Sequence, residues 1–375
     1  MRRPDLAPRR IRWVILPFLA VVALAAVWTV FWFYAASIAQ ATLDRWREQE
    51  SRLGRVYTCG SQTAGGYPFR IEVRCTDAAL EMRAALPPLI VKAKDLVAVA
   101  QVYDPGLLIA EITGPLVISD PGGRESFVAT WQVAQASLRG RPSAPERISI
   151  AVDSLRVDRE REGGGVTLAS ASRFEAHARA SPDATPENAV VDLAIRLTGA
   201  TASAAGSFAT LPLDADVAAV LRGLRGFAPK ALPALLRDLQ AAGGRLELSS
   251  VRIQQGEAVA RATGALGLSG SGRLDGTILL TIAGLEKFVA AQGGLQKFLP
   301  SAGVPNRAAP ALSALDRFAP ALGDAARERF ESGLLGLLGE RTQLEGRPAI
   351  AVPLRLSDGA AFLGPVPLGQ TPPLY

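Results

Sequence analysis

The chain has 375 residues, of which 49% are hydrophobic and 20% charged, with a formal net charge of +6 and a pI near 9.7. Five arginines and one aspartate in residues 1–12 account for +4 of that charge, so the remainder is close to neutral. The basic excess therefore does not indicate a nucleic-acid-binding surface. The length is sufficient to bury a large core.

The first 43 residues predict a membrane anchor. The five arginines precede a run from Trp13 to Leu43 that contains no charged residue. An α-helix needs about 20 apolar residues to cross about 30 Å of hydrocarbon. Aromatic side chains mark the two ends of such a span, here Trp13 at one end and Trp28, Trp32 and Tyr34 at the other. We expect a cytoplasmic basic tail at 1–12 and a transmembrane anchor at 13–38.

A cleaved signal peptide is the alternative interpretation of this segment. Ala39-Gln40-Ala41 has the small-x-small form of a cleavage site. The apolar run exceeds the roughly 7–15 residues of a signal-peptide core, which favours an uncleaved signal-anchor. Arginines on its N-terminal flank predict a cytoplasmic N-terminus. The abundance of Arg and Ala suggests a GC-rich bacterial genome, so we expect a single-pass inner-membrane protein whose main domain is periplasmic.

The next segment predicts a stalk helix at 39–54 followed by a disulfide-linked hairpin. The chain has two cysteines, Cys59 and Cys75, and an oxidising compartment favours their pairing. Gly65-Gly66 is a turn signal and Tyr67 to Val73 alternates as a strand does. A hairpin folded near Gly65 would place both cysteines at bridging distance. Closing this loop contributes about 3 kcal/mol by the chain-entropy estimate.

Residues 55–205 predict an N-terminal region of antiparallel strands. Apolar and polar residues alternate in several segments separated by turn formers such as Asp104-Pro105-Gly106 and Gly163-Gly164-Gly165. The expected strands are Tyr67–Val73, Leu89–Lys94, Leu107–Ile118, Phe127–Leu138, Ile148–Asp153, Val166–Ala180 and Val190–Leu197.

Residues 206–375 predict a region of mixed strands and helices. Two amphipathic helices are expected near 212–240, because apolar residues recur at helical spacing from Val217 to Phe227 and from Leu232 to Leu239. Further helical patterns lie between 285 and 339. The expected strands are Arg245–Ile253, Glu257–Leu268, Arg273–Ala283, Ala349–Leu356 and Phe362–Leu368.

The fold class that follows is strand-rich α+β. We expect an N-terminal transmembrane helix followed by a large, antiparallel, curved sheet domain with covering amphipathic helices. Whether 55–375 forms one domain or two is left open.

The sequence offers no catalytic, cofactor or metal motif. The single histidine, His177, alternates with Arg173, Glu175 and Arg179, which indicates a solvent-facing position. A zinc site needs more nitrogen or sulfur ligands than His177 and two bridged cysteines supply. Phosphate-binding loops, Gly-x-Ser-x-Gly elbows and Ser-x-x-Lys pairs are absent from the sequence. We therefore expect no enzyme and no cofactor.

One segment carries a family resemblance. Gly66, Tyr67, Pro68, Phe69 and Arg70, followed by Cys75, resemble a motif of an uncharacterised family of alphaproteobacterial membrane-anchored envelope proteins, the domain-of-unknown-function family 2125. The closing Asp358-Gly359, Leu363-Gly364-Pro365 and Pro367-Leu368 fit the same pattern. The resemblance covers nearly the whole chain and implies no catalytic or binding residue.

A weaker resemblance links residues 244–285 to repeats of AsmA-like envelope proteins, whose curved sheets hold acyl chains on an apolar inner face. It implies a lipid carrier or sensor. The membrane tether and the many strands with one apolar face support the same hypothesis, in which phospholipid binds in a groove lined by strand residues such as Val73, Leu89, Val91, Ile278, Leu280 and Ile282. The other hypothesis is an interaction or scaffold protein that binds another envelope protein through a sheet edge or through the helices. Ordinary core packing would produce the same alternation, so the sequence leaves these interpretations open.

Overall fold

The computed structural model describes residues 9–375 except for 86, 124, 142–143, 162–163, 183, 186–188, 203–210, 225, 227–231 and 285–338. The chain forms two compact units, 1–128 and 129–375. Three expected features lie outside the described residues: the regional boundary at 205/206, the Phe227 end of the first helix expected near 212–240, and nearly all of the helical segment 285–339.

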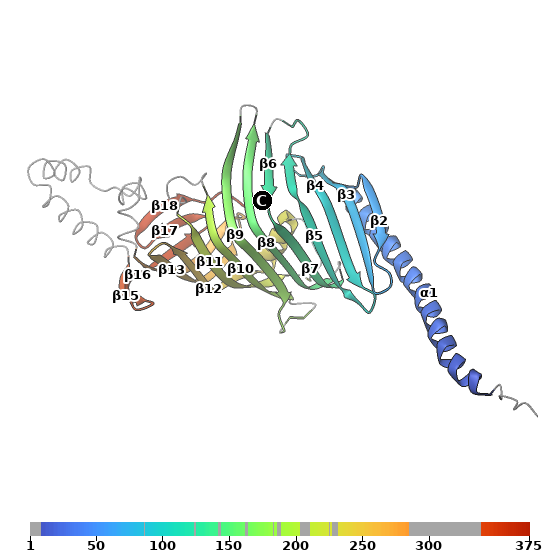
Figure 1. The fold of residues 1–375 in the computed structure, drawn as a ribbon. Helices are drawn as coiled ribbons and strands as arrows, with labels where there is room; N and C mark the ends of the chain where they lie inside the picture. The colour runs from blue at the N-terminus through green and yellow to red at the C-terminus, as the bar shows by residue number, and fades with distance from the viewer. Residues whose placement is uncertain are drawn as a thin grey trace, which may run out of the picture. The chain divides into compact units, whose positions relative to one another are not determined.

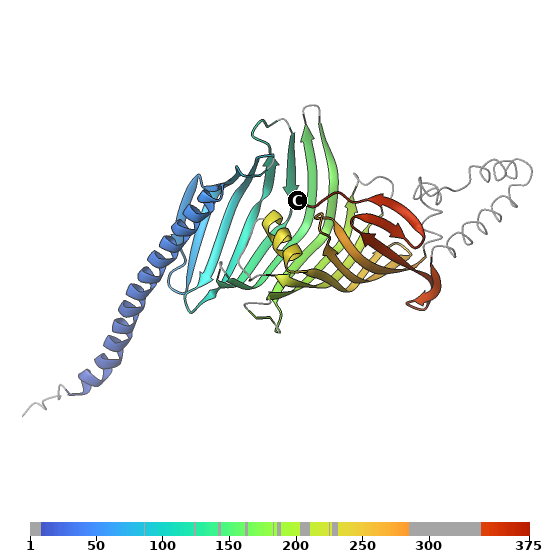
Figure 2. The ribbon, with the colours of Figure 1, turned by 180° about the vertical axis from the view of Figure 1, so that it is seen from behind.

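The first unit begins with one long helix, α1 (Arg9–Arg52), which contains both the expected anchor and nearly all of the expected stalk. The helix ends where Gly54 takes a left-handed backbone (φ +78°), and a Cβ there would lie 2.9 Å from Cβ of Ala84. Figures 1 and 2 show the N-terminal half of α1 extending beyond the sheet and its C-terminal half running beside the first strands.

The sheet of the first unit is antiparallel in its described pairings. Both β1 and β2 pair with β3, which pairs with β4, which pairs with β5. The strands are β1 (Arg55–Thr58), β2 (Ser61–Gly65), β3 (Arg70–Met82), β4 (Leu89–Gln101) and β5 (Asp104–Ser119). Strand β6 (Glu125–Thr130) spans the position in the chain where the first unit ends.

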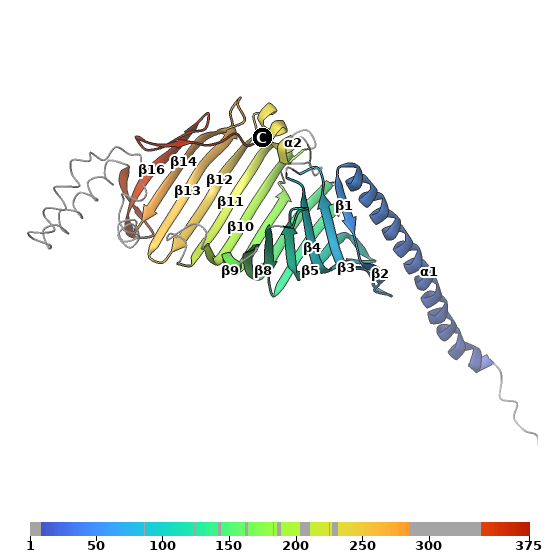
Figure 3. The same ribbon diagram turned by 90° about the horizontal axis from the view of Figure 1, so that it is seen from above.

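The second unit is a larger antiparallel sheet. Its neighbours follow chain order from β7 to β14, after which β14 pairs with β16, β15 and β17 pair with β16, and β18 pairs with β17. Figure 3 shows these strands side by side from β8 to β16. They are β7 (Val133–Arg141), β8 (Ala144–Arg161), β9 (Gly164–Ala180), β10 (Ala189–Ala202), β11 (Leu213–Leu224), β12 (Arg245–Gln255), β13 (Ala258–Leu268), β14 (Leu274–Ala283), β15 (Glu340–Leu344), β16 (Arg347–Ser357), β17 (Ala360–Leu363) and β18 (Val366–Gln370).

The strand-rich fold class is confirmed, but three elements differ from expectation. The helix expected from Val217 is strand β11, and only its successor, α2 (Leu232–Ala241), is helical. Residues 213–224 pair on both sides, with β10 and β12, and this ladder outweighs a local helical spacing. The strand expected over Phe127–Leu138 is broken at Trp131 into β6 and β7, and that over Phe362–Leu368 is broken at Gly364-Pro365 into β17 and β18.

Candidate functional site

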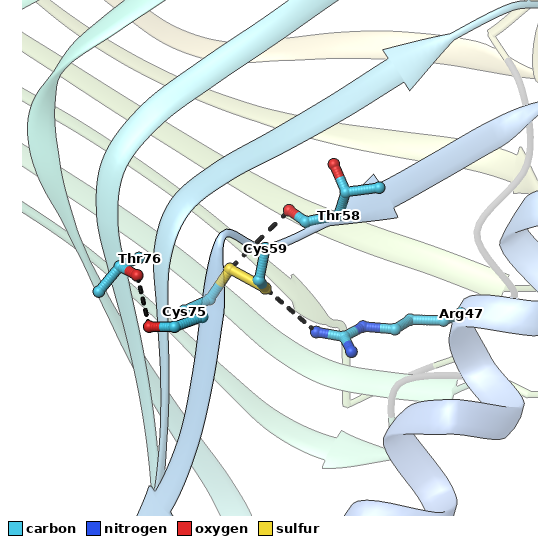
Figure 4. Close-up of a disulfide and its surroundings, with 6 residues drawn as sticks. Arg47, Thr58, Cys59, Cys75 and Thr76 are labelled. Atoms are coloured by element: carbon cyan, nitrogen blue, oxygen red, sulfur yellow. Dashed lines mark hydrogen bonds between the residues drawn. A yellow bond between two sulfur atoms is a disulfide. The ribbon is translucent and has the colours of Figure 1, made fainter.

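The disulfide joins the segment after β1 to the middle of β3. Cys59 and Cys75 are bonded and their Cα atoms lie 5.4 Å apart, which confirms the predicted pairing. The backbone N–H of Gly60 donates to the carbonyl of Thr76 at 2.8 Å, so the chain is held beside β3 next to the bridge. Nη2 of Arg47 in α1 lies 3.5 Å from Sγ of Cys59, and Figure 4 shows the Arg47 side chain directed toward the bridge. The bridge therefore also meets the C-terminal half of α1.

The motif from Gly66 to Arg70 forms the β2–β3 turn and contacts α1 directly. The indole Nε1 of Trp28 donates to the carbonyl of Pro68, and that of Trp32 donates to the carbonyl of Arg70, both at 2.9 Å. The hydroxyls of Thr29 and Tyr67 lie 2.8 Å apart. Gly66 is required at the turn because its φ is +100° and a Cβ would lie 2.6 Å from the carbonyl oxygen of Arg70.

The six residues expected to line a groove are divided between the two units. Val73, Leu89 and Val91 belong to the first unit, where they pair with Ala98, Met82 and Leu80, respectively. Ile278, Leu280 and Ile282 alternate along β14 in the second unit and therefore share one face of its sheet.

The face that carries Ile278, Leu280 and Ile282 is apolar across much of the second sheet. Residues that pair directly across antiparallel strands point to the same face. The row that contains Leu280 runs from β7 to β16 through Ala136, Ile150, Ala176, Ile195, Val217, Val251, Ala262, Leu280 and Val352. We call this surface the apolar face.

Only part of the apolar face is covered by the described residues. Leu235, Leu236 and Leu239 of α2 pack at one end of it, against residues that include Leu221 and Leu268, and Figure 2 shows α2 lying over the sheet. Val352 is 3% exposed at the β16 side, whereas Ile150 and Ile195 are 40% and 42% exposed at the other. Large aliphatic side chains thus remain accessible on β8 and β10.

The opposite surface, which we call the ionic face, carries rows of paired charges. The row next to Ile195 contains Glu175, Arg196, Asp216, Arg252 and Arg261 in consecutive strands. Nε of Arg196 donates to Asp216 at 2.6 Å, and Nε of Arg252 donates to Glu345 at 2.8 Å. The sheet therefore separates charged and apolar residues by strand alternation.

These hydrogen bonds stabilise the ionised carboxylates. The hydrogen bond from Arg252, with a further one from Arg261, lowers the pKa of Glu345 from its usual 4.5 to about 2. Hydrogen bonds from Arg173 and Arg222 lower the pKa values of Glu175 and Glu247, respectively. These carboxylates of the ionic face are consequently matched to arginines of the same protein.

His177 lies on the ionic face, as its alternation with Glu175 and Arg179 predicts. It lines an open depression of about 270 Å³ together with small residues, including Ala194, Ala218 and Ser250. Within the described residues, no three His, Cys, Asp or Glu side chains come together as a metal site would require. Glu175, Arg196 and Asp216 also line this depression. Arg196 donates to Asp216 and Arg173 donates to Glu175, so these charges are engaged in ion pairs.

The Asp358-Gly359 turn of the closing segment forms hydrogen bonds to the turn between β13 and β14 at the end of the second sheet. The carboxylate of Asp358 accepts hydrogen bonds from the hydroxyls of Ser269, at 2.6 Å, and Ser271. These bonds lower the pKa of Asp358. The N–H of Gly359 donates to the carbonyl of Leu274, and a Cβ at Gly359 would lie 2.8 Å from Cδ of Arg273. The closing motif thus has a structural role in joining two turns.

Among the described residues, α1 is the one helix long and apolar enough to cross a membrane. This is consistent with the predicted anchor and does not by itself distinguish it from a signal sequence.

Comparison with protein families matches residues 32–372 to the model of DUF2125, described as uncharacterized proteins conserved in bacteria. The chain belongs to this family. The match begins in α1 at Trp32 and includes both the motif turn and the closing segment. Neither the curated proteins nor the solved structures contain a match.

Sequence reasoning missed the extent of the apolar face. The signal was present, because Leu193, Ile195 and Leu197 alternate with Asp192, Ala194 and Arg196 in one strand. In the neighbouring strands many positions are alanine, which fits either face. Only the register shows that those alanines continue the same apolar row.

Proposed function

We propose that this DUF2125 protein is a membrane-anchored envelope protein that binds lipid acyl chains on the apolar face of its second unit. The observation that carries the proposal is the accessible aliphatic surface that includes β8 and β10. On the opposite face, Arg196 pairs with Asp216 and Arg252 pairs with Glu345. We further propose that α1 is an uncleaved anchor in the inner membrane and that the strands of both units are periplasmic.

The chemistry of the apolar face suits an acyl chain. Between β8 and β16 the row through Ile195 consists only of aliphatic residues. Ala262 and Val352 are buried in this row, so the accessible part runs from β8 to β12. These five strands, spaced about 4.8 Å apart, span about 19 Å, over which an acyl chain can lie. Such a ligand requires apolar contact and few polar groups, and burial gains about 25 cal/mol per Å² of apolar surface.

The membrane tether favours lipid over a soluble apolar ligand. A chain held at a bilayer by α1 is surrounded by phospholipid at high local concentration. The binding role also accounts for a protein without a catalytic motif in its sequence. A protein partner docking on the same face is the competing occupant, and site-specific crosslinking distinguishes the two.

The test uses a photo-crosslinking amino acid placed on either face of one strand. Ile195 and Ala194 are adjacent in β10, both are exposed, and they point to opposite faces. The full-length protein with p-benzoylphenylalanine at position 195 is irradiated in cells, and the adduct is identified by mass spectrometry. The same substitution at position 194 is the matched control.

We expect a phospholipid adduct at position 195 and little or none at position 194. Equal lipid labelling at both positions would indicate contact with bulk membrane and contradict the proposal. A protein adduct at position 195 would contradict lipid binding and support partner docking. Absence of any adduct would contradict both.

The proposed topology has its own measurement. Alkaline phosphatase fused after Tyr375 should be active if the C-terminus is periplasmic, and the chain should resist carbonate extraction if α1 is uncleaved. An inactive fusion would overturn the orientation, and a soluble product lacking residues 1–41 would identify a cleaved signal peptide.

A further inference from the structure

The strand ends nearest α1 pack as one cluster against residues 28–36 of the helix. Trp32, Ala36 and Val102 pack together with Trp28 and Ile71. The N–H of Val102 donates to the carbonyl of Phe69 at 3.0 Å, which joins the β4–β5 turn to the β2–β3 turn. Together with the two indole hydrogen bonds to Pro68 and Arg70, these contacts fix both turns beside residues 28–36 of α1.

That height corresponds to one boundary of the membrane. The apolar run begins at Trp13, directly after the arginines. From Trp13 the helix rises about 23 Å to Trp28 and about 29 Å to Trp32, at 1.5 Å per residue. Because the hydrocarbon core is about 30 Å thick, the two turns lie at the interface opposite the N-terminal flank.

The turns expose aromatic side chains at this height. Tyr67, Phe69 and Tyr103 are 52%, 63% and 68% exposed, although all three are large and at least partly apolar. Arg70, beside them, is also exposed, and its ion-pair partner Glu72 lies at 3.2 Å. Aromatic rings with a neighbouring arginine are the side chains that favour the headgroup region of a bilayer.

We infer that the turns containing residues 66–69 and 102–103 insert into the headgroup region of the leaflet where α1 leaves the bilayer. Tyr67, Phe69 and Tyr103 are the membrane-contacting residues of this surface. The first unit then binds the membrane at two places, through the span and through its sheet end. This inference rests on the proposed anchoring by α1 and is independent of lipid binding by the second unit.

The test measures the depth of a fluorophore at the turn. Both native cysteines are in the disulfide, so a single introduced cysteine can be labelled with an environment-sensitive NBD dye. Tyr103→Cys reports on the turn, and Arg83→Cys, exposed at the opposite end of β3, is the matched control. Val22→Cys, within the span, reports that α1 is inserted.

The full-length labelled proteins are reconstituted in vesicles of phosphatidylethanolamine and phosphatidylglycerol that contain a doxyl-labelled phospholipid quencher. We expect at least about twofold quenching at positions 22 and 103 and none at position 83. Quenching at 22 without quenching at 103 would overturn the inference while retaining the anchor. Equal quenching at 83 and 103 would also overturn it, because the sheet would then lie flat on the bilayer.

Discussion

In the first unit, α1 packs through Trp32 and Ala36 against Val102 and the disulfide ties the chain to β3, whereas in the second unit α2 packs over one end of the sheet and leaves Ile150 and Ile195 accessible. Both sheets are built from antiparallel strands with apolar alternation. The same alternating pattern is therefore buried where a helix packs on the sheet, and it remains accessible where no described helix covers it. Four predictions test this difference, from the largest expected effect to the smallest.

Trp32→Ala should have the largest effect, because Trp32 is 6% exposed and its indole bonds the Arg70 carbonyl. Truncating a packed tryptophan costs about 3–5 kcal/mol. Hydrogen exchange of the protein in nanodiscs should show faster exchange at residues 69–75 and 99–102. Val30→Ala, at an exposed position of the same helix, should leave exchange unchanged. Equal behaviour of the two variants would mean that α1 does not hold the sheet.

Cys59→Ser should lower the free energy of unfolding of the first unit by about 3 kcal/mol, because it opens the loop closed by the disulfide. The two cysteines are 16 residues apart. Chemical denaturation under non-reducing conditions measures the change, and reduction of the wild-type protein should reproduce it. An unchanged unfolding midpoint in both experiments would show that the bridge does not stabilise the unit.

Glu345→Gln should reduce the acid sensitivity of the second unit. The folded-state pKa of Glu345 is about 2, below its usual 4.5, so its ion pairs with Arg252 and Arg261 stabilise the fold above pH 4.5. This stability is lost as the pH falls from 4.5 toward 2. The melting temperature of the wild type should therefore fall more steeply than that of the variant over this window. Parallel curves would exclude a contribution from these pairs.

Ile195→Asp should have the smallest effect on stability, about 1 kcal/mol, because the side chain is already partly accessible and Asp is disfavoured in a strand. Its matched contrast is Val352→Asp in the same row, where an unpaired carboxylate would be buried at a cost above about 2 kcal/mol. Thermal unfolding compares the two variants. A large loss of stability at position 195 would show that this part of the apolar face is packed and would contradict the proposed lipid-binding surface.

Local sequence was sufficient for the elements whose signals are short-range. The uncharged run after Trp13, the cysteines flanking Gly65-Gly66, the strands around Ile278 and the helix from Leu232 all agree with the structure, because span length, turn chemistry and periodicity are local properties. The solvent-facing position of His177 followed from the same alternation.

The segment from Val217 shows where local reasoning failed. Val217, Val220, Leu221 and Leu224 fit a helical period, yet Ala215, Val217, Ala219 and Leu221 also form one side of a strand. Alanine is compatible with either pattern, so the two could not be separated locally. Pairing with β10 and β12 decided the outcome, with Asp216 meeting Arg196 across the ladder.

The sequence by itself determined the apolar span, the disulfide and the antiparallel strand character, since each depends on residues near one another in the chain. Tertiary structure alone decided that Trp28 and Trp32 bond the motif turn 38 to 40 residues away. It also decided that Ile150, Ile195 and Leu280 share one row. Helix docking depends on contacts between distant segments. Register depends on the turns as well as on the hydrophobic pattern, so the periodicity of one strand does not say which residues of its neighbour it meets.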